Sequence, residues 1–172
     1  GSKSIPHKNI KSFNGKPLCY WYLNELNKSE YIDIIIVATD SLEIIDVVKS
    51  FKFKKINIFR RSKKNSTDTS STESVILEFL SSDKFKYDKE DIFLLCQSTS
   101  PLTKKTDFEK GIDNLINNNF DSVISVVNQN RFFWDENGIS LNYDPQNRPR
   151  RQDFRSQIVE NGSFYITYIK SI

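Results

Sequence analysis

Small polar side chains that could bind a ligand follow one of the most apolar runs in the chain. Residues 97–100 read QSTS and come directly after Ile92–Cys96, a continuous apolar run typical of a strand covered on both faces. Thr106, with Glu109 three residues later, forms a capping-box pattern that predicts a helix start. Open α/β sheets bind ligands at the carboxyl ends of their strands. The pattern predicts a ligand site at Gln97, although such residues are also ordinary turn chemistry.

Two further stretches could hold phosphate. In the polar segment 1–16, small residues precede Lys3, and Lys8 and Asn9 follow, so that backbone amides and ammonium groups could bind an anion together. Ser70 begins a predicted helix whose free amides would lie near an arginine, Arg61. The alternatives are a solvated basic loop for the first stretch, and an N-cap serine with a surface arginine for the second.

A late segment is rich in arginine. Residues 147–155 read NRPRRQDFR and contain four arginines, with Asp153 as the only acid among them. Arg148 precedes a proline, which biases its backbone towards an extended conformation. The segment could be a solvated loop, a basic tract of the localisation type, or an anion-binding cluster.

Composition narrows the function classes. The 172 residues are most simply one domain, and the balance of 25 basic against 22 acidic residues is too even to indicate a nucleic-acid partner. The single histidine, His7, excludes a mechanism that needs two, and the chain has no cysteine–histidine pattern for zinc. Cys19 and Cys96 lie in apolar runs, as expected of buried thiols in a reducing cytosol. With no membrane-spanning run or signal peptide recognised, we expect a cytoplasmic protein.

The remaining pattern predicts the elements that position these residues. Buried strands are expected at 32–38, 57–59, 92–96 and 122–127, with helices between them at about 17–26, 40–48 and 70–80 and from 106 onwards. This alternation indicates an α/β fold with a parallel sheet and helices on both faces. Asn137-Gly138, flanked by extended aromatic segments, predicts a hairpin, and an alternating aromatic strand is expected at 162–169.

Seven motifs, in order, resemble those of the CMP-sialic acid synthetases (N-acylneuraminate cytidylyltransferases). They are GSKSIPHKN, VATDS, RRSKKNSTDTSST, LLCQSTSPL, FDSVISVV, NRPRRQDF and ENGSFYI. The resemblance covers almost the whole chain, and the last two motifs are similar to those of the animal-type branch. It implies a mostly parallel, doubly wound (Rossmann-like) nucleotidyltransferase sheet as a single domain over residues 1–172. It also implies a homodimer, in which a small extension, here the hairpin 131–143, reaches the partner's site.

The resemblance further implies a reaction and its residues. CTP and a nonulosonic (sialic-type) acid would give the CMP-sugar and pyrophosphate, with magnesium, mainly through positioning and charge stabilisation. Matching positions imply catalytic roles for Arg148, Lys3 and Lys8. They imply nucleotide binding by Gly1, Ser2, Asn9, Arg61, Ser70, Thr72 and Gln97, and sugar binding by Gln97, Asn161 and Arg151.

Some features of that family are not matched. Its first strand, with the arginine ahead of its glycine loop, would precede Gly1, and its magnesium-binding aspartate pair would follow Ile172, so no metal ligand is predicted within these residues. Thr103 and Val159 stand where family members often have arginine, which leaves the sugar preference open. The alternatives are a nucleotidyltransferase for another acidic sugar and a non-catalytic anion- or nucleic-acid-binding module. Convergence of Lys3, Arg61, Gln97 and Arg148 on one cleft would favour the enzyme.

Overall fold

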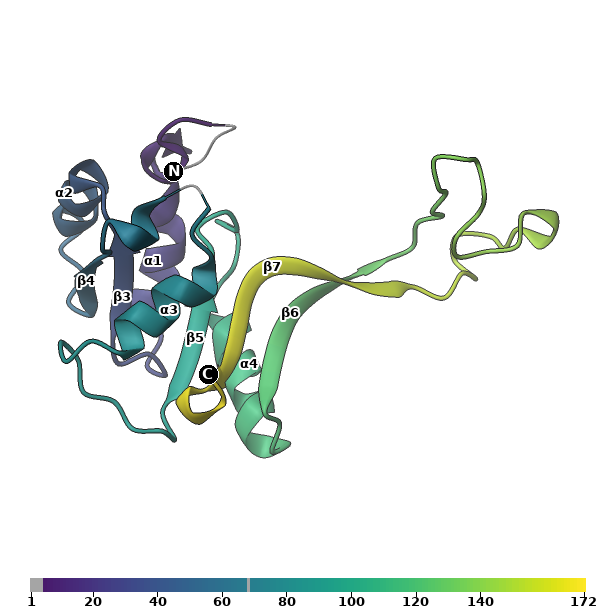
Figure 1. The fold of residues 1–172 in the computed structure, drawn as a ribbon. Helices are drawn as coiled ribbons and strands as arrows, with labels where there is room; N and C mark the ends of the chain where they lie inside the picture. The colour runs from purple at the N-terminus through teal and green to yellow at the C-terminus, as the bar shows by residue number, and fades with distance from the viewer. Residues whose placement is uncertain (1–4, 68) are drawn as a thin grey trace.

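The computed structural model describes residues 5–67 and 69–172, which form a rounded body and a long two-stranded arm (Figure 1). The strands are β1 (Ser12–Phe13), β2 (Lys16–Pro17), β3 (Ile35–Thr39), β4 (Ile56–Arg60), β5 (Ile92–Cys96), β6 (Ser122–Gln129) and β7 (Gln157–Tyr168). The helices are α1 (Leu18–Lys28), α2 (Leu42–Ser50), α3 (Thr72–Leu80) and α4 (Lys105–Asn117). Short 3-10 turns are η1 (Lys8–Ile10), η2 (Lys64–Ser66), η3 (Pro145–Asn147) and η4 (Ile169–Ser171).

The strands of the body form one parallel pair and one antiparallel group. β3 and β4 pair in parallel through the crossover helix α2, as their buried, β-branched runs predict. β7 lies between β5 and β6 and is antiparallel to both, so β5 and β6 run in the same direction. The predicted α/β fold is confirmed. The direction of its closing strand, which the sequence did not predict, follows from the way the chain returns along the arm.

The core lies where α1 and α4 pack against the strands. Tyr22 of α1 and Phe108 of α4 stack at 5.2 Å between ring centroids, and Phe108 meets Phe164 of β7 edge to face at 5.5 Å. Leu115 is fully buried beside them. On the other face, α3 places Phe79 against Phe59 of β4 at 5.4 Å (Figure 1). Helices therefore cover the strands from both sides, as the α/β pattern requires.

The predicted helix starts are wrong by one or two residues. Ser41, not Asp40, is the N-cap of α2, because its hydroxyl accepts the hydrogen bond from the Ile44 amide. Ser71, not Ser70, is the N-cap of α3. The capping box of α4 pairs Asp107 with Lys104 rather than Glu109 with Thr106. Each start is preceded by several adjacent small polar residues or lysines, and local sequence does not decide which of them caps.

The arm consists of the outer halves of β6 and β7 and the segment 130–156 at their far end (Figure 1). The two strands shift register at a bulge between Ile124 and Val126, where the ribbon leaves the body. At the far end the chain reverses at Asn137-Gly138, with an isolated antiparallel bridge between Trp134 and Ser140. Gly138 has φ 77°, a conformation that favours glycine.

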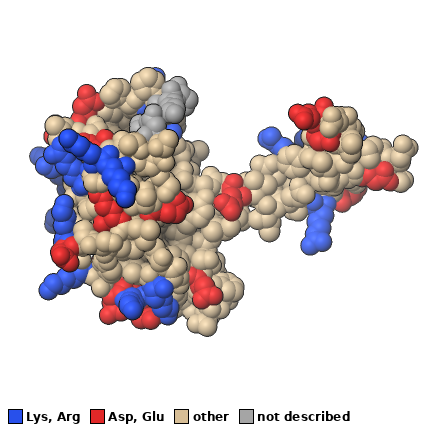
Figure 2. Space-filling view, viewed as in Figure 1, with Lys and Arg blue, Asp and Glu red and all other residues tan. Residues whose placement is uncertain are grey.

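Aromatic side chains hold the end of the arm together. Phe132 lies 4.3 Å from Tyr143 and 4.9 Å from Phe154 between ring centroids, and Trp134 lies 5.6 Å from Tyr143. Large apolar side chains nevertheless remain exposed along the arm, among them Ile139, Leu141 and Ile158. Figure 2 shows much of the arm's visible surface without charge, whereas acidic and basic side chains are interspersed on the body.

Candidate functional site

Two loops from distant parts of the sequence meet at the carboxyl end of β5. The Ser98 hydroxyl donates a 2.7 Å hydrogen bond to Oδ1 of Asn9, which lies in η1. The N-terminal segment is also linked to α2, because Nδ1 of His7 lies 2.9 Å from a carboxylate oxygen of Glu43. Residues 5–11 therefore connect the loop after β3 with the loop after β5. This is the edge at which the sequence predicted a ligand site.

Gln97 begins the loop after β5 and lies beside the Asn161-Gly162 turn of β7. Its backbone amide donates to the Ser163 carbonyl at 3.2 Å, while its side chain is exposed. Gly162 has φ 67°, and a side chain added there would meet Oε1 of Gln97 at 3.9 Å. Gln97 therefore lies next to Gly162, and its side chain is exposed to solvent.

The Asn161 side chain is engaged within the protein. Its Oδ1 accepts hydrogen bonds from the Ser125 hydroxyl at 2.7 Å and from the Ser163 amide at 3.0 Å. Ser125 stands in β6 at the register shift and also accepts from the Phe164 amide at 2.9 Å. Asn161 of β7 thus joins the two strands at this shift through its carbonyl oxygen, and within the described part of the chain its Nδ2 group remains for a ligand.

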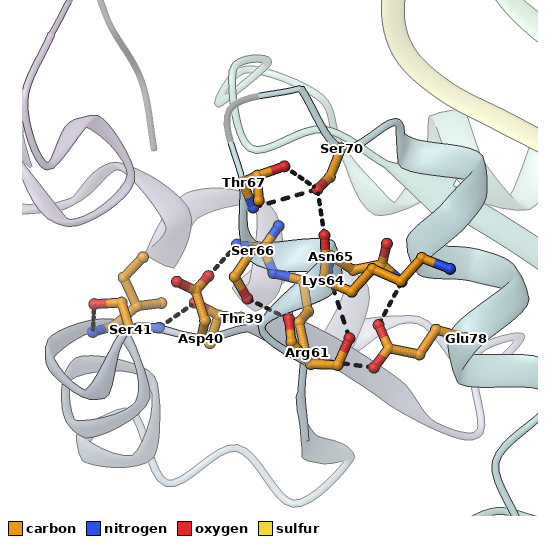
Figure 3. Close-up of polar contacts among 12 residues, drawn as sticks. Thr39, Asp40, Ser41, Arg61, Lys64, Asn65, Ser66, Thr67, Ser70 and Glu78 are labelled. Atoms are coloured by element: carbon orange, nitrogen blue, oxygen red, sulfur yellow. Dashed lines mark hydrogen bonds and ion pairs between the residues drawn. The ribbon is translucent and has the colours of Figure 1, made fainter.

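Arg61 follows β4 and forms an ion pair with Asp40, which follows β3 (Figure 3). The hydrogen bond from Arg61 holds the pKa of the Asp40 carboxyl below its usual value. Nε of Arg61 is buried and has no hydrogen-bond acceptor among residues 5–67 and 69–172. The guanidinium is therefore only partly satisfied, as expected of a cation that also receives an anionic ligand.

Ser70 stabilises the loop before α3 rather than the helix itself. Its hydroxyl lies 2.7 Å from Oγ1 of Thr67 and donates to the Lys64 carbonyl at 3.1 Å (Figure 3). Glu78 of α3 holds the same loop from the other side, accepting from the Ser62 amide at 2.8 Å. Thr72 is the first residue of α3 and is exposed.

Arg148 and Arg151 lie far from the carboxyl end of β5 in the same chain. Both belong to segment 130–156 at the end of the arm (Figure 1). The Arg148 guanidinium stacks on Phe132 at 4.7 Å and on Tyr143 at 5.8 Å from the ring centroids, and the residue is exposed. Arg150 pairs with Asp153 of the same loop at 3.4 Å. Gly1, Ser2 and Lys3 lie outside the described residues, while Lys8 lies in η1 beside Asn9.

A buried hydroxyl cluster below the loop after β5 was not found from the sequence. Ser163 Oγ lies 2.6 Å from Thr103 Oγ1, and the Ser163 carbonyl accepts from the Tyr22 hydroxyl at 2.7 Å. Burial raises the pKa of the neighbouring Cys96 thiol to about 12 and that of Cys19 to about 11, so both stay protonated at neutral pH. No local pattern marks this cluster, because its members come from three separate elements.

The described residues contain no group of three or more histidine, cysteine, aspartate or glutamate side chains placed to hold a metal ion. The part of the chain that the structure describes therefore offers no such cluster for the magnesium expected from the resemblance. None of the helices in the described part of the chain is long and apolar enough to cross a membrane.

Sequence comparison identifies the class of protein to which this α/β fold, with polar loops at the carboxyl ends of its strands, belongs. The family described as Cytidylyltransferase matches residues 1–163, so the chain belongs to that family. Two solved structures share the fold with a TM-score of 0.64 each. One is 4-diphosphocytidyl-2C-methyl-D-erythritol synthase from Anaerococcus prevotii, 18% identical over 93% of this chain and 63% of that one. The other is CMP:2-keto-3-deoxy-manno-octonic acid synthetase complexed with CTP, 17% identical over 99% and 72%.

Relatives of known activity narrow the comparison to particular acidic sugars. The chain is 38% identical to N-acylneuraminate cytidylyltransferase of Oncorhynchus mykiss, over 96% of the chain and 38% of the relative. It is 35% identical to N-acylneuraminate cytidylyltransferase B of Danio rerio, over 99% and 40%. Pseudaminic acid cytidylyltransferase of Campylobacter jejuni is 29% identical, over 96% and 73%. The resemblance to the animal enzymes is confirmed, and the chain spans about two fifths of the length of the two fish proteins.

Proposed function

We propose that the protein containing this chain is a cytidylyltransferase that transfers the CMP group of CTP to a nonulosonic acid. The observation that carries the proposal is the meeting of Asn9, Ser98 and Gln97 at the carboxyl end of β5, in a chain of the Cytidylyltransferase family. The anomeric hydroxyl of the sugar attacks the α-phosphorus of CTP and loses its proton. A new oxygen–phosphorus bond forms, the bond between the α- and β-phosphates breaks, and pyrophosphate leaves.

The proposed roles follow from the charges of the residues, from the resemblance for Gly1, Ser2 and Lys3, and from the observed places of the others. Lys8 and Arg61, with the amides of Gly1 and Ser2 and the ammonium of Lys3, neutralise the triphosphate. Asn9 and Thr72 face the nucleoside, and Ser70 contributes to nucleotide binding by holding the loop before α3 in place. Gln97 lies between nucleotide and sugar, because its exposed side chain stands at the turn that begins with Asn161. Magnesium would screen the triphosphate, with ligands that the described residues do not supply.

Arg148 and Arg151 reach the site of a second copy. The arm holds both arginines away from the loop of their own chain, and its exposed apolar side chains favour burial against a protein surface (Figure 1). The proposed assembly is therefore a homodimer in which each arm supplies arginines for the partner's site. Neither nucleic acid nor membrane has a part in this function, and the cytoplasm is the proposed compartment, with the nucleus as the alternative in an animal.

The decisive experiment is a turnover assay on the full-length protein. Pyrophosphate release is measured with CTP and magnesium against a panel of neuraminic, legionaminic, pseudaminic and 3-deoxy-octulosonic acids. We expect release with at least one nonulosonic acid, and preference for CTP over ATP, GTP and UTP. Release only with the octulosonic acid would favour another acidic sugar, and equal release with all four nucleotides would contradict the CTP preference.

A further inference from the structure

Ser98 controls the orientation of an amide at the proposed nucleotide site. Its hydroxyl donates to Oδ1 of Asn9 at 2.7 Å, across 89 positions of sequence. An amide whose oxygen is held in this way has its nitrogen on the opposite side of the group. Among the residues that the structure describes, no acceptor is hydrogen-bonded to Nδ2 of Asn9. The two N–H donors of this group, which no described residue engages, thus have a fixed direction.

The backbone that carries Asn9 is held by other bonds. The Ile10 and Lys11 amides both donate to the His7 carbonyl at 3.0 Å, and the Lys11 carbonyl accepts from the Leu18 amide at 2.9 Å. These bonds do not involve Ser98. The hydrogen bond from Ser98 is therefore responsible for the rotation of the Asn9 side chain, not for the position of η1.

The loop that carries Ser98 is also held independently. Gln97 is tied to the Ser163 carbonyl through its amide at 3.2 Å, and Thr103 is tied to the Ser163 hydroxyl at 2.6 Å. Ser163 is buried, so both ends of the loop rest on a rigid support. Removal of the Ser98 hydroxyl would leave Gln97 in place.

We propose that Ser98 is a positioning residue that orients the Asn9 amide towards an acceptor atom of the bound nucleotide. This inference rests on the proposed function, in which Asn9 faces the nucleoside. A free amide would rotate, and ordering it would reduce the affinity for the nucleotide. Because Gln97 and Lys8 stay in place, the effect falls on nucleotide binding and not on the chemical step.

The test measures binding and turnover separately in the full-length protein. CTP affinity is determined by calorimetry in the absence of sugar, and KM and kcat are determined with an accepted sugar. The variants are Ser98→Ala, Ser98→Thr, Asn9→Ala and the double variant of Ser98→Ala with Asn9→Ala. Ser81→Ala is the control, because it removes a serine hydroxyl that donates to the Leu77 carbonyl at the end of α3, away from the loop after β5.

We expect Ser98→Ala to weaken CTP binding and raise KM for CTP about 3- to 10-fold, the worth of one hydrogen bond. The kcat should stay close to wild type, Ser98→Thr should restore affinity, and Ser98→Ala should have no further effect once Asn9 is alanine. Unchanged affinity in Ser98→Ala, or an equal loss in the Asn9→Ala background, would overturn this inference alone. A wild-type protein that does not bind CTP would overturn the proposed function as well.

Discussion

Individual side chains at the candidate site differ in how far the protein already satisfies them. The Asn161 carbonyl oxygen and the Ser70 hydroxyl are bonded within the chain, which makes them supports for loops. The Gln97 side chain is exposed, and Nε of Arg61 has no acceptor in the described part of the chain. Free hydrogen-bonding capacity therefore separates residues suited to bind a ligand from those that position the binding residues.

Replacement of Gln97 tests a side chain that faces solvent at the strand end. We expect Gln97→Ala to lower kcat/KM because one oriented hydrogen bond to a charged ligand is lost, at a cost of about 1.5–3 kcal/mol. The backbone bond to Ser163 remains, so the melting temperature should not change. Steady-state kinetics with both substrates and a thermal melt check these two results. An unchanged kcat/KM for both substrates would refute the role.

Replacement of Arg148 by lysine tests whether the planar guanidinium at the end of the arm is needed. A lysine keeps the charge but loses the two-pronged fork and the stacking on Phe132 and Tyr143. We expect Arg148→Lys to lose most of kcat at saturating CTP and sugar, with magnesium present. The matched control is Arg155→Lys, another exposed arginine of the same segment, which should lose little. Full activity in Arg148→Lys would show that the arginines are only surface charge.

At the scale of elements, α4 is the helix that fixes the antiparallel group of strands. One side of α4 contributes Phe108, Ile112 and Leu115 to the core, and its opposite side is exposed. Gly111 allows the close contact, because a side chain there would lie 2.6 Å from Ile166 and 3.1 Å from Phe164. The loop after β5 runs directly into this helix, so the packing of α4 also supports Gln97.

Two adjacent residues of α4, one buried and one exposed, allow a matched comparison of how substitution changes the free energy of unfolding. Leu115 is fully buried, whereas Ile116 is 53% exposed. We expect Leu115→Ala to lower the free energy of unfolding by about 2–5 kcal/mol, because it leaves a cavity in the core. Ile116→Ala should change it by about 0.5 kcal/mol or less, as at other surface positions. Urea denaturation of both variants measures the difference, and equal losses would contradict this account of the core.

At the scale of the whole molecule, the arm is the part whose apolar side chains are least covered by its own chain. A two-stranded ribbon has no second layer to cover its faces, and Ile158 is 70% exposed on it. Arg148, proposed for catalysis, and Arg151, proposed for sugar binding, lie in the segment at its far end. In the proposed homodimer, a second copy would both cover the arm and receive these arginines at its site.

The expected assembly is a homodimer of the full-length protein at micromolar concentration. Light scattering should give twice the mass of one full-length protein chain. The reason is that the exposed apolar side chains of the arm become buried against the partner. Substitution of Ile139 and Leu141 by serine should shift the mass towards the monomer, whereas serine at the exposed Leu102 of the body should not. A monomeric wild type would count against the assembly.

A heterodimer of two inactive variants tests whether the arm acts on the partner. Gln97→Ala and Arg148→Ala chains, carrying different tags, are co-expressed and purified through both tags. One site of such a dimer has both substitutions and the other has neither, so about half of the wild-type activity per dimer should return. Activity no higher than that of the parent variants would place Arg148 in the site of its own chain.

Local sequence determined much of this protein. Apolar runs and polar breaks predict the strands, since burial on both faces of a sheet requires continuous hydrophobic segments. Gln97 could be placed at a strand end, and Asn137-Gly138 at a reversal, for the same local reasons. The ordered motifs were sufficient to identify the family, and the comparison with known relatives confirms that identification. The helix starts were less well predicted, because neighbouring serines can cap with similar energies.

The tertiary structure alone decided which distant residues meet. The direction of β7, the contact between Asn9 and Ser98, and the cluster around Ser163 all join segments far apart in sequence. A hydrophobic pattern with a period of a few residues records which face is buried, but not against which partner. The separation of Arg148 from Gln97 likewise depends on the course of the arm, because β6 and β7 continue beyond the body and carry the arginine segment away from the sheet.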